Sequence, residues 1–333
     1  ALSAASHLAT ASGARLAWIP RRAGERGALE AGALPHVLPG GRPFAEAEAR
    51  VDIAAAWGVP HVPVRAGRDT DAIIGALADD SLSAAVVAGV ELTDLPDPTA
   101  ARAALEAAGF VVSLEVRRSE VTDLADVVLP VAPVSEKSGT FVNWEGRDRP
   151  FPAVFAESTA MPDSRILDSL AAELGVRLGL PTVEAARAEL AELGRWDGAR
   201  AEAPDLPASV TTNPGSGEAV LATWRMLLDA GRLQDGEPHL AGTARRPVAR
   251  VSAATAAEVG VADGAGLVVS SGRGSVTLPL EITEMPDRVV WVPQNSPGSR
   301  VSLDLGARAG DVVTVTAAAA DVSPIQPTAG GVG

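Results

Sequence analysis

The chain has 333 residues, enough for two domains of ordinary size, and its hydrophobic content of 47% is typical of a globular protein. The formal net charge is -14 and the basic residues are scattered, so a surface that binds nucleic acid is excluded. Because the chain has no cysteine, disulfides, thiolate zinc sites and cysteine-ligated iron-sulfur clusters are excluded within these residues. No apolar run approaches the roughly 18 residues that span a bilayer, so direct membrane insertion is not expected.

The first part of the chain predicts alternating helices and strands. Residues 1–11 have the composition of a helix, and residues 20–43 predict a long glycine-rich loop of the kind that covers a ligand. Asp97, Pro98 and Gly109 are the residue types expected at the N-cap, the first position and the end of a helix. This alternation predicts a parallel sheet. Strands are expected at residues 16–19, 59–64, 84–90, 110–116 and 127–131, and helices at residues 44–57, 71–78, 98–108, 163–178 and 183–193.

The composition changes after residue 194. Residues 195–246 are rich in Ala, Pro, Asp, Ser and Gly and predict a linker with one helix, at residues 218–228. Short β-rich runs separated by glycine-containing and Pro-Asp turns follow this linker. About five strands within so short a stretch predict a small closed barrel, because closure removes exposed edges. These runs lie at residues 248–251, 266–270, 275–283, 288–292 and 311–316.

The most polar segment follows the strand expected at residues 127–131. In an open α/β sheet, ligands bind beyond the carboxyl ends of the strands, so this segment is the first candidate for a site. Its glycines can adopt positive φ, and its charged side chains can either face a ligand or bond to one another; the residues alone fit both interpretations. The candidate residues are Glu136, Gly139, Thr140, Asn143, Glu145, Gly146 and Arg147.

Familiar catalytic patterns are absent from the sequence. The four histidines lie far apart and form no zinc motif, so no metal site is expected. The Gly-Arg-Gly triplet at residues 272–274 lacks the third glycine and the helix of a dinucleotide fingerprint, and predicts a hairpin turn. Lys137, the only lysine, is interpreted as a solvated charge. No catalytic residue is therefore expected.

One long motif carries a resemblance. Ala-Asp-Val-Val-Leu-Pro at residues 125–130, followed by Glu-Lys-Ser-Gly-Thr-Phe-Val-Asn-Trp-Glu-Gly-Arg at residues 136–147, resembles the signature of the molybdopterin oxidoreductase superfamily. The resemblance implies an α/β fold with a Rossmann-like parallel sheet and a small carboxyl-terminal double-psi β-barrel. The expected parts are an α/β domain at residues 1–194, a linker at 195–246, a barrel of the molybdopterin-dinucleotide-binding type at 247–317 and a disordered tail at 318–333.

Within that superfamily, the segment at residues 290–299 and the short barrel are similar to the family of the G subunit of bacterial, in particular actinobacterial, NADH:quinone oxidoreductase, respiratory complex I. This resemblance implies a structural domain with neither pterin nor metal, in which the candidate loop and Asn295 are a vestigial pterin-facing motif. The chain is expected to be the carboxyl-terminal part of such a subunit. [4Fe-4S] and [2Fe-2S] clusters, which relay electrons from NADH and FMN toward quinone, are implied for a preceding part.

The same resemblance implies partners and a location. The partners would be other peripheral-arm subunits of complex I, on the cytoplasmic side of the plasma membrane. Arg147 would pair with a carboxylate instead of a pyrophosphate, and its loss is expected to cost about 1 to 3 kcal/mol through the orphaned partner.

Two alternatives stay open. The first is a catalytic molybdenum or tungsten bis-pterin oxidoreductase similar to formate dehydrogenase, in which the candidate loop and Asn295 would touch the dinucleotide. Active members of the superfamily commonly continue Glu-Gly-Arg with a hydrophobic residue and Gln, whereas this chain has Asp-Arg-Pro at residues 148–150, which favours the structural interpretation. The second alternative is a stand-alone nucleotide-binding module.

Overall fold

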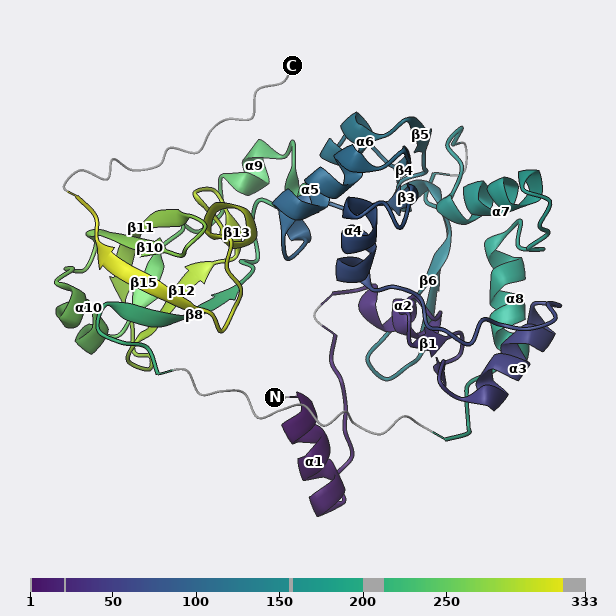
Figure 1. Ribbon diagram of the computed structural model, residues 1–333, viewed down its shortest axis with the longest axis horizontal. Helices are drawn as coiled ribbons and strands as arrows, with labels where there is room; N and C mark the ends of the chain where they lie inside the picture. The colour runs from purple at the N-terminus through teal and green to yellow at the C-terminus, as the bar shows by residue number, and fades with distance from the viewer. Residues whose placement is uncertain (1, 21, 156–157, 200–212, 320–333) are drawn as a thin grey trace. The chain divides into compact units, whose positions relative to one another are not determined.

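The computed structural model describes residues 2–20, 22–155, 158–199 and 213–319. The chain divides into two compact units (Figure 1). The first unit comprises residues 1–89 and 104–208, and the second comprises residues 90–103 and 209–333. The division of the sequence at residues 194, 246 and 317 stays a prediction. Among the described residues, no helix has both the length and the apolar character needed to cross a membrane.

The first unit is built on a three-stranded parallel sheet. Its strands β3 (Ala84–Ala88), β4 (Phe110–Glu115) and β5 (Val127–Pro130) are hydrogen-bonded in that order. Each strand is a short Val-rich run, which suits a pleated surface. Ile166, on helix α7 (Asp163–Glu173), is buried with Leu114 of β4 in one hydrophobic cluster. The parallel sheet predicted from the sequence is confirmed.

Helices and short strand pairs complete this part of the chain. Their starts follow side-chain caps where the sequence provides them: Asp97 Oδ1 accepts from the N–H of Ala100 at 3.0 Å, and Thr182 Oγ1 accepts from the N–H of Ala185 at 3.2 Å. The remaining elements up to residue 193 are α1 (Leu2–Ser12), α2 (Glu25–Glu30), β1 (Val37–Leu38), β2 (Arg42–Pro43), α3 (Ala47–Ala56), α4 (Thr70–Ala78), η1 (Leu92–Asp94), α5 (Pro98–Ala107), α6 (Glu120–Leu124), η2 (Val134–Glu136), β6 (Gly139–Val142), β7 (Asp148–Phe151) and α8 (Val183–Leu193).

Three local predictions in this part are wrong. Residues 16–19 and 59–64 form no strand, and both Trp18 and Ile19 are exposed. A strand needs a hydrogen-bonded neighbour, which an apolar run by itself does not supply. The segment expected to be an unstructured loop at residues 20–43 contains helix α2 and the β1–β2 pair.

The second unit is organised around a closed six-stranded barrel in the order β10-β11-β9-β12-β8-β15. Its interior is one cluster of buried aliphatic side chains, contributed by all six strands. Closure is therefore confirmed, and it leaves the barrel strands without a free edge. The strands are β8 (Glu218–Trp224), β9 (Ala249–Val251), β10 (Gly266–Ser270), β11 (Ser275–Ile282), β12 (Val289–Pro293) and β15 (Val312–Ala317).

Strand β8 replaces the helix predicted at residues 218–228, and that prediction is wrong. Ala219 and Leu221 are buried in the barrel, whereas the residues between and after them are less buried, which is the alternation of a strand. β8 pairs in parallel with β12 and antiparallel with β15. Residues such as Ala and Leu favour helices, but pairing on both sides overrides this local preference.

Shorter elements connect the barrel strands. The shorter elements are η3 (Arg232–Gln234), α9 (Pro238–Ala241), α10 (Ala253–Val259), β13 (Asn295–Ser296), β14 (Ser299–Arg300) and the π-helical η4 (Val301–Leu305).

Residues 320–333 lie outside the described residues, so the disordered tail at 318–333 stays a prediction.

Candidate functional site

The candidate loop folds as a β-hairpin after strand β5. β6 and β7 pair antiparallel, with Gly139 opposite Phe151. A Cβ atom on Gly139 would lie 2.5 Å from the Phe151 ring, so this glycine is required by close packing. Phe151 also stacks on Phe141, with ring centroids 5.1 Å apart. The aromatic contacts therefore fix the base of the hairpin.

Hydrogen bonds within the hairpin close its turn. Asn143 Oδ1 accepts from the N–H of Arg147 at 2.9 Å, and the Asn143 carbonyl accepts from the N–H of Gly146 at 2.8 Å. Gly146 has φ of +77°, the conformation that glycine tolerates best. Asn143 also donates through Nδ2 to Glu145 at 3.3 Å. The amide side chain of Asn143 thus organises the turn that holds the Glu-Gly-Arg motif.

Arg147 pairs with a carboxylate, as the family resemblance implies, and its partner is Glu145 at 3.4 Å. The Arg147 side chain is 65% exposed, however. Exposed ion pairs contribute at most about 1 kcal/mol, because water screens them and two long side chains must be ordered. The expectation that loss of Arg147 costs about 1 to 3 kcal/mol applies to a buried ion pair. Because this pair is exposed, the expected cost is lower.

Two arginines that the sequence did not indicate hold the hairpin from outside. Arg187, on helix α8, donates through Nε to Thr140 Oγ1 at 2.8 Å and through a second nitrogen to the carbonyl of Gly139. Arg195 donates to the carbonyl of Gly146. Each arginine lies far along the chain from its partner, and no motif links them in the sequence. Two arginine side chains of this chain thus donate hydrogen bonds to backbone carbonyls of the hairpin.

The remaining polar residues at the start of the loop also have partners. Glu136 accepts a hydrogen bond from Ser158 Oγ. Lys137 pairs with Asp163, the first residue of α7, and is partly buried. The interpretation of Lys137 as a solvated charge is therefore wrong: it links the loop to the N-terminus of a helix.

A cavity of about 470 Å³ adjoins the hairpin. Its charged lining consists of two arginines and two carboxylates, so their formal charges cancel, and both arginines already donate to hairpin oxygens. The charged side chains of this cavity therefore supply no net positive charge for a pyrophosphate-bearing pterin. The residues that line this cavity include Gly27, Glu30, Thr140, Asp148, Arg187 and Arg195.

Asn295 belongs to the barrel unit, whereas the hairpin belongs to the first unit. It lies in β13, is buried, and its carbonyl accepts from the N–H of Ala230 at 2.8 Å. Ser299 Oγ donates to the carbonyl of Pro293 at 2.7 Å and closes the turn around it. Throughout the ranges that the structure describes, no group of three or more His, Asp or Glu side chains has the arrangement of a metal site.

Comparison with known proteins gives matches over both parts of the chain. The family model described as molybdopterin oxidoreductase matches residues 4–173, and that described as molydopterin dinucleotide binding domain matches residues 233–332.

Two curated relatives carry the same name. The NADH-quinone oxidoreductase G subunit of Mycobacterium bovis is 59% identical over 95% of this chain and 40% of that protein. The protein of the same name from Streptomyces coelicolor is 56% identical over 94% of this chain and 38% of that protein. The chain thus spans about 40% of the length of these relatives. Among solved structures, acetylene hydratase from Pelobacter acetylenicus has a TM-score of 0.48 and 17% identity, covering 73% of this chain and 42% of that chain.

Proposed function

Because the chain belongs to the molybdopterin oxidoreductase family and to its G-subunit branch, we propose that it is a structural, cofactor-free part of the G subunit of NADH-quinone oxidoreductase. In this proposal, [4Fe-4S] and [2Fe-2S] clusters in another part of the subunit relay electrons from NADH and FMN toward quinone. The residues of this chain supply shape and contact surface.

The observation that carries the proposal is the internal bonding of the hairpin. Arg187 and Arg195 donate to Thr140, Gly139 and Gly146, the positions that the family motif would turn toward a pterin. A guanidinium that is already bonded to protein oxygens has fewer donors left for a pyrophosphate. Oxygen atoms of the motif are therefore already hydrogen-bonded to side chains of this chain.

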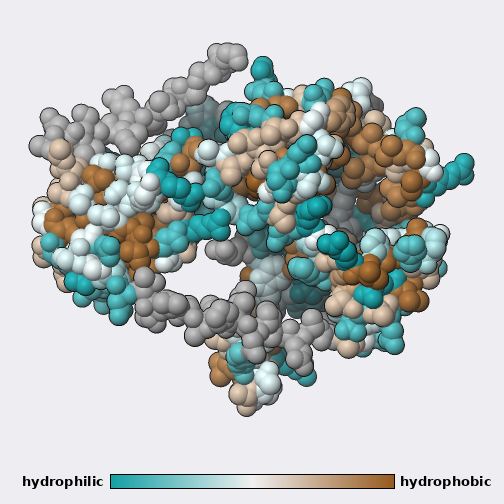
Figure 2. All heavy atoms as spheres, viewed as in Figure 1, coloured by the Kyte–Doolittle hydropathy of each residue, from teal (hydrophilic) through white to brown (hydrophobic). Residues whose placement is uncertain are grey.

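Exposed apolar surface supports a role in an assembly. On the first unit, hydrophobic residues gather over α7 and the chain that leads to it (Figure 2). Such patches mark protein contacts when they are contiguous. Val86, on strand β3, is also exposed, although both faces of a parallel sheet are ordinarily covered. We assign these surfaces to contacts with other peripheral-arm subunits of the complex, on the cytoplasmic side of the plasma membrane. The exposed apolar residues in α7 and in the described chain that flanks it are Val154, Phe155, Met161, Leu167 and Leu174.

The alternative, a molybdenum or tungsten bis-pterin oxidoreductase similar to formate dehydrogenase, is not favoured. The balanced charge of the hairpin cavity opposes binding of a polyanionic cofactor. The high identity to two G subunits of NADH-quinone oxidoreductase also supports the structural role.

The proposal is tested on the intact complex purified from its source. We expect elemental analysis to find iron but no stoichiometric molybdenum or tungsten, and oxidation of the extract to release no fluorescent pterin. Stoichiometric molybdenum or tungsten would overturn the cofactor-free role. In the same complex, Arg187→Gln is expected to lower the amount assembled without changing NADH-to-quinone turnover per bound FMN. A loss of turnover at unchanged assembly would contradict a purely structural hairpin.

A further inference from the structure

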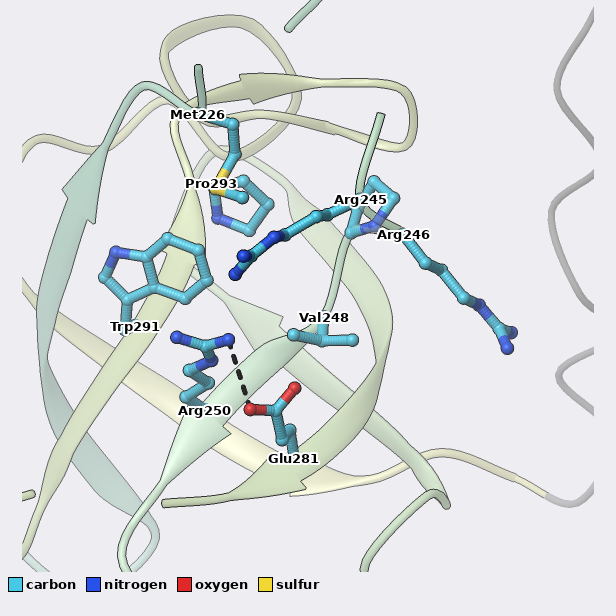
Figure 3. A pocket seen from close by; sticks show the side chains of 9 residues that line it. Met226, Arg245, Arg246, Val248, Arg250, Glu281, Trp291 and Pro293 are labelled. Atoms are coloured by element: carbon cyan, nitrogen blue, oxygen red, sulfur yellow. Dashed lines mark ion pairs between the residues drawn. The ribbon is translucent and has the colours of Figure 1, made fainter. Parts of the chain in front are cut away.

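Two adjoining cavities open on the barrel unit. The first has a volume of about 400 Å³ and combines an aromatic wall with arginines (Figure 3). The second, of about 350 Å³, shares Met226 and Arg245 with the first and is also lined by Trp224 and Leu227. Six residues around the first are Met226, Arg245, Arg250, Glu281, Trp291 and Pro293.

Arg245 stands at the boundary between the two cavities. Its guanidinium extends into the first cavity toward Trp291 and Arg250 (Figure 3). It has neither a hydrogen bond nor an ion pair with any residue in the described ranges. Arg250, by contrast, pairs with Glu281 at 3.1 Å and lies over the Trp291 ring, 5.1 Å from its centroid. The guanidinium of Arg245 is therefore available to an occupant of the first cavity.

The local charge is opposite to that of the whole chain. Three arginines line the first cavity, the third being Arg246, against the single carboxylate of Glu281. The chain as a whole carries a net charge of -14. The guanidinium of Arg246 points away from the cavity (Figure 3), so it adds to the field without reaching an occupant. The site thus favours an anionic group.

The second cavity supplies apolar contact. Trp224 is 52% exposed and Leu227 is 94% exposed. The Trp224 and Trp291 rings are tilted against each other with centroids 5.0 Å apart, which joins the aromatic walls of the two cavities. Exposed Trp side chains beside Arg are characteristic of the few residues that dominate protein interfaces.

We propose that the two cavities bind an acidic, extended peptide segment of a partner protein. A carboxylate of this segment meets Arg245, whose planar guanidinium can bind both carboxylate oxygens. In an extended chain, alternate side chains lie on one face about 7 Å apart, so apolar residues two before and two after the acidic residue can enter the two cavities. Arg245 lines both cavities, so an extended segment whose carboxylate meets Arg245 can contact both, whereas a mononucleotide would fill only one.

The experiment uses the full chain and two fluorescent peptides, one containing Leu-Ser-Glu-Ser-Leu and the other Leu-Ser-Gln-Ser-Leu. Fluorescence anisotropy is expected to show the Glu peptide binding at least about tenfold more tightly than the Gln peptide, because only the carboxylate forms a charge-assisted bond. Arg245→Gln should abolish this difference between the peptides. Arg246→Gln is the matched control, since it removes the same charge from the next residue but should retain the discrimination.

Three results would overturn the proposal. Equal binding of the two peptides to the unaltered chain would remove the role of the carboxylate. Equal loss of discrimination in both variants, with unchanged melting temperatures, would indicate a diffuse charge effect. Displacement of the Glu peptide by guanosine monophosphate at lower concentration than by unlabelled Glu peptide would assign the cavities to nucleotides. The inference concerns a surface of the barrel and does not depend on whether the hairpin is cofactor-free.

Discussion

At the residue scale, the contribution of an arginine to the stability of the hairpin depends on its bonding partners and its burial. Membership of the family motif does not decide it. Arg147 belongs to the family motif, yet its side chain is mostly exposed and pairs with Glu145, its neighbour in the same turn. Arg187 belongs to no motif, yet its side chain is less exposed, at 36%, and bonds to the hairpin at two points. The stabilising contribution is therefore expected from the arginine that lies outside the motif.

This contrast gives a paired prediction. Arg187→Ala removes the donors to Thr140 and Gly139 and is expected to lower the free energy of unfolding by about 1 to 2 kcal/mol. Arg147→Ala removes an exposed pair and is expected to lower it by less than about 1 kcal/mol. Urea unfolding at neutral pH measures both. A larger loss for Arg147→Ala than for Arg187→Ala would contradict the assignment of these contacts.

At the element scale, the sequence predicted those elements that have a clear local signal, such as a helix cap or a short apolar run bounded by turn residues. The start of α5 follows from Asp97 and Pro98, and the three strands of the parallel sheet follow from short runs rich in apolar residues. Strand β8 was missed because its composition is compatible with a helix, and only pairing with β12 and β15 selects the strand. The strands expected at residues 16–19 and 59–64 fail for the converse reason, since no neighbouring strand among the described residues pairs with them.

The cap of α5 gives a pH-dependent prediction. The N–H of Ala100 donates to Asp97 and, with Arg273 nearby, holds the pKa of this carboxyl below its ordinary value of 3.8 despite partial desolvation. A lowered pKa in the folded state means that the stabilisation is present above the unfolded pKa and is lost as pH falls through the folded pKa. Asp97→Ala is therefore expected to cost about 1 kcal/mol near pH 7 and progressively less below about pH 4.

A non-titrating cap provides the control for this measurement. Thr182 caps α8 through the N–H of Ala185 at 3.2 Å. Thr182→Ala is expected to cost a similar amount, about 1 kcal/mol, with no dependence on pH over the same range. Urea unfolding of both variants across the acid range compares them. A pH-independent cost for Asp97→Ala would show that its charge does not contribute.

At the scale of the whole molecule, the chain has separate hydrophobic cores. Ile53 is buried in a cluster of the first unit, and Leu221 is buried in the barrel cluster of the second. A chain with two cores is expected to unfold in more than one cooperative step. The family resemblance drawn from the motif at residues 125–147 is confirmed at this scale, since a family model matches residues 4–173.

Substitutions in each core test this organisation. Leu221→Ala and Ile53→Ala each leave a cavity and are expected to cost about 2 to 5 kcal/mol. In differential scanning calorimetry, each substitution should lower the melting temperature of one transition and leave the other in place. If both substitutions shift a single common transition, the two units unfold together.

The sequence by itself determined the three strands of the parallel sheet, the barrel strands after residue 247, and the family to which the chain belongs. Those features depend on short-range periodicity, caps and an ordered motif, all of which are local. Only the tertiary structure placed β8 in the barrel, brought Arg187 and Arg195 to the hairpin, and set Arg245 between two cavities. Each of these depends on contacts between residues far apart in the chain, whose pairing is selected by packing and hydrogen bonding after the local elements form.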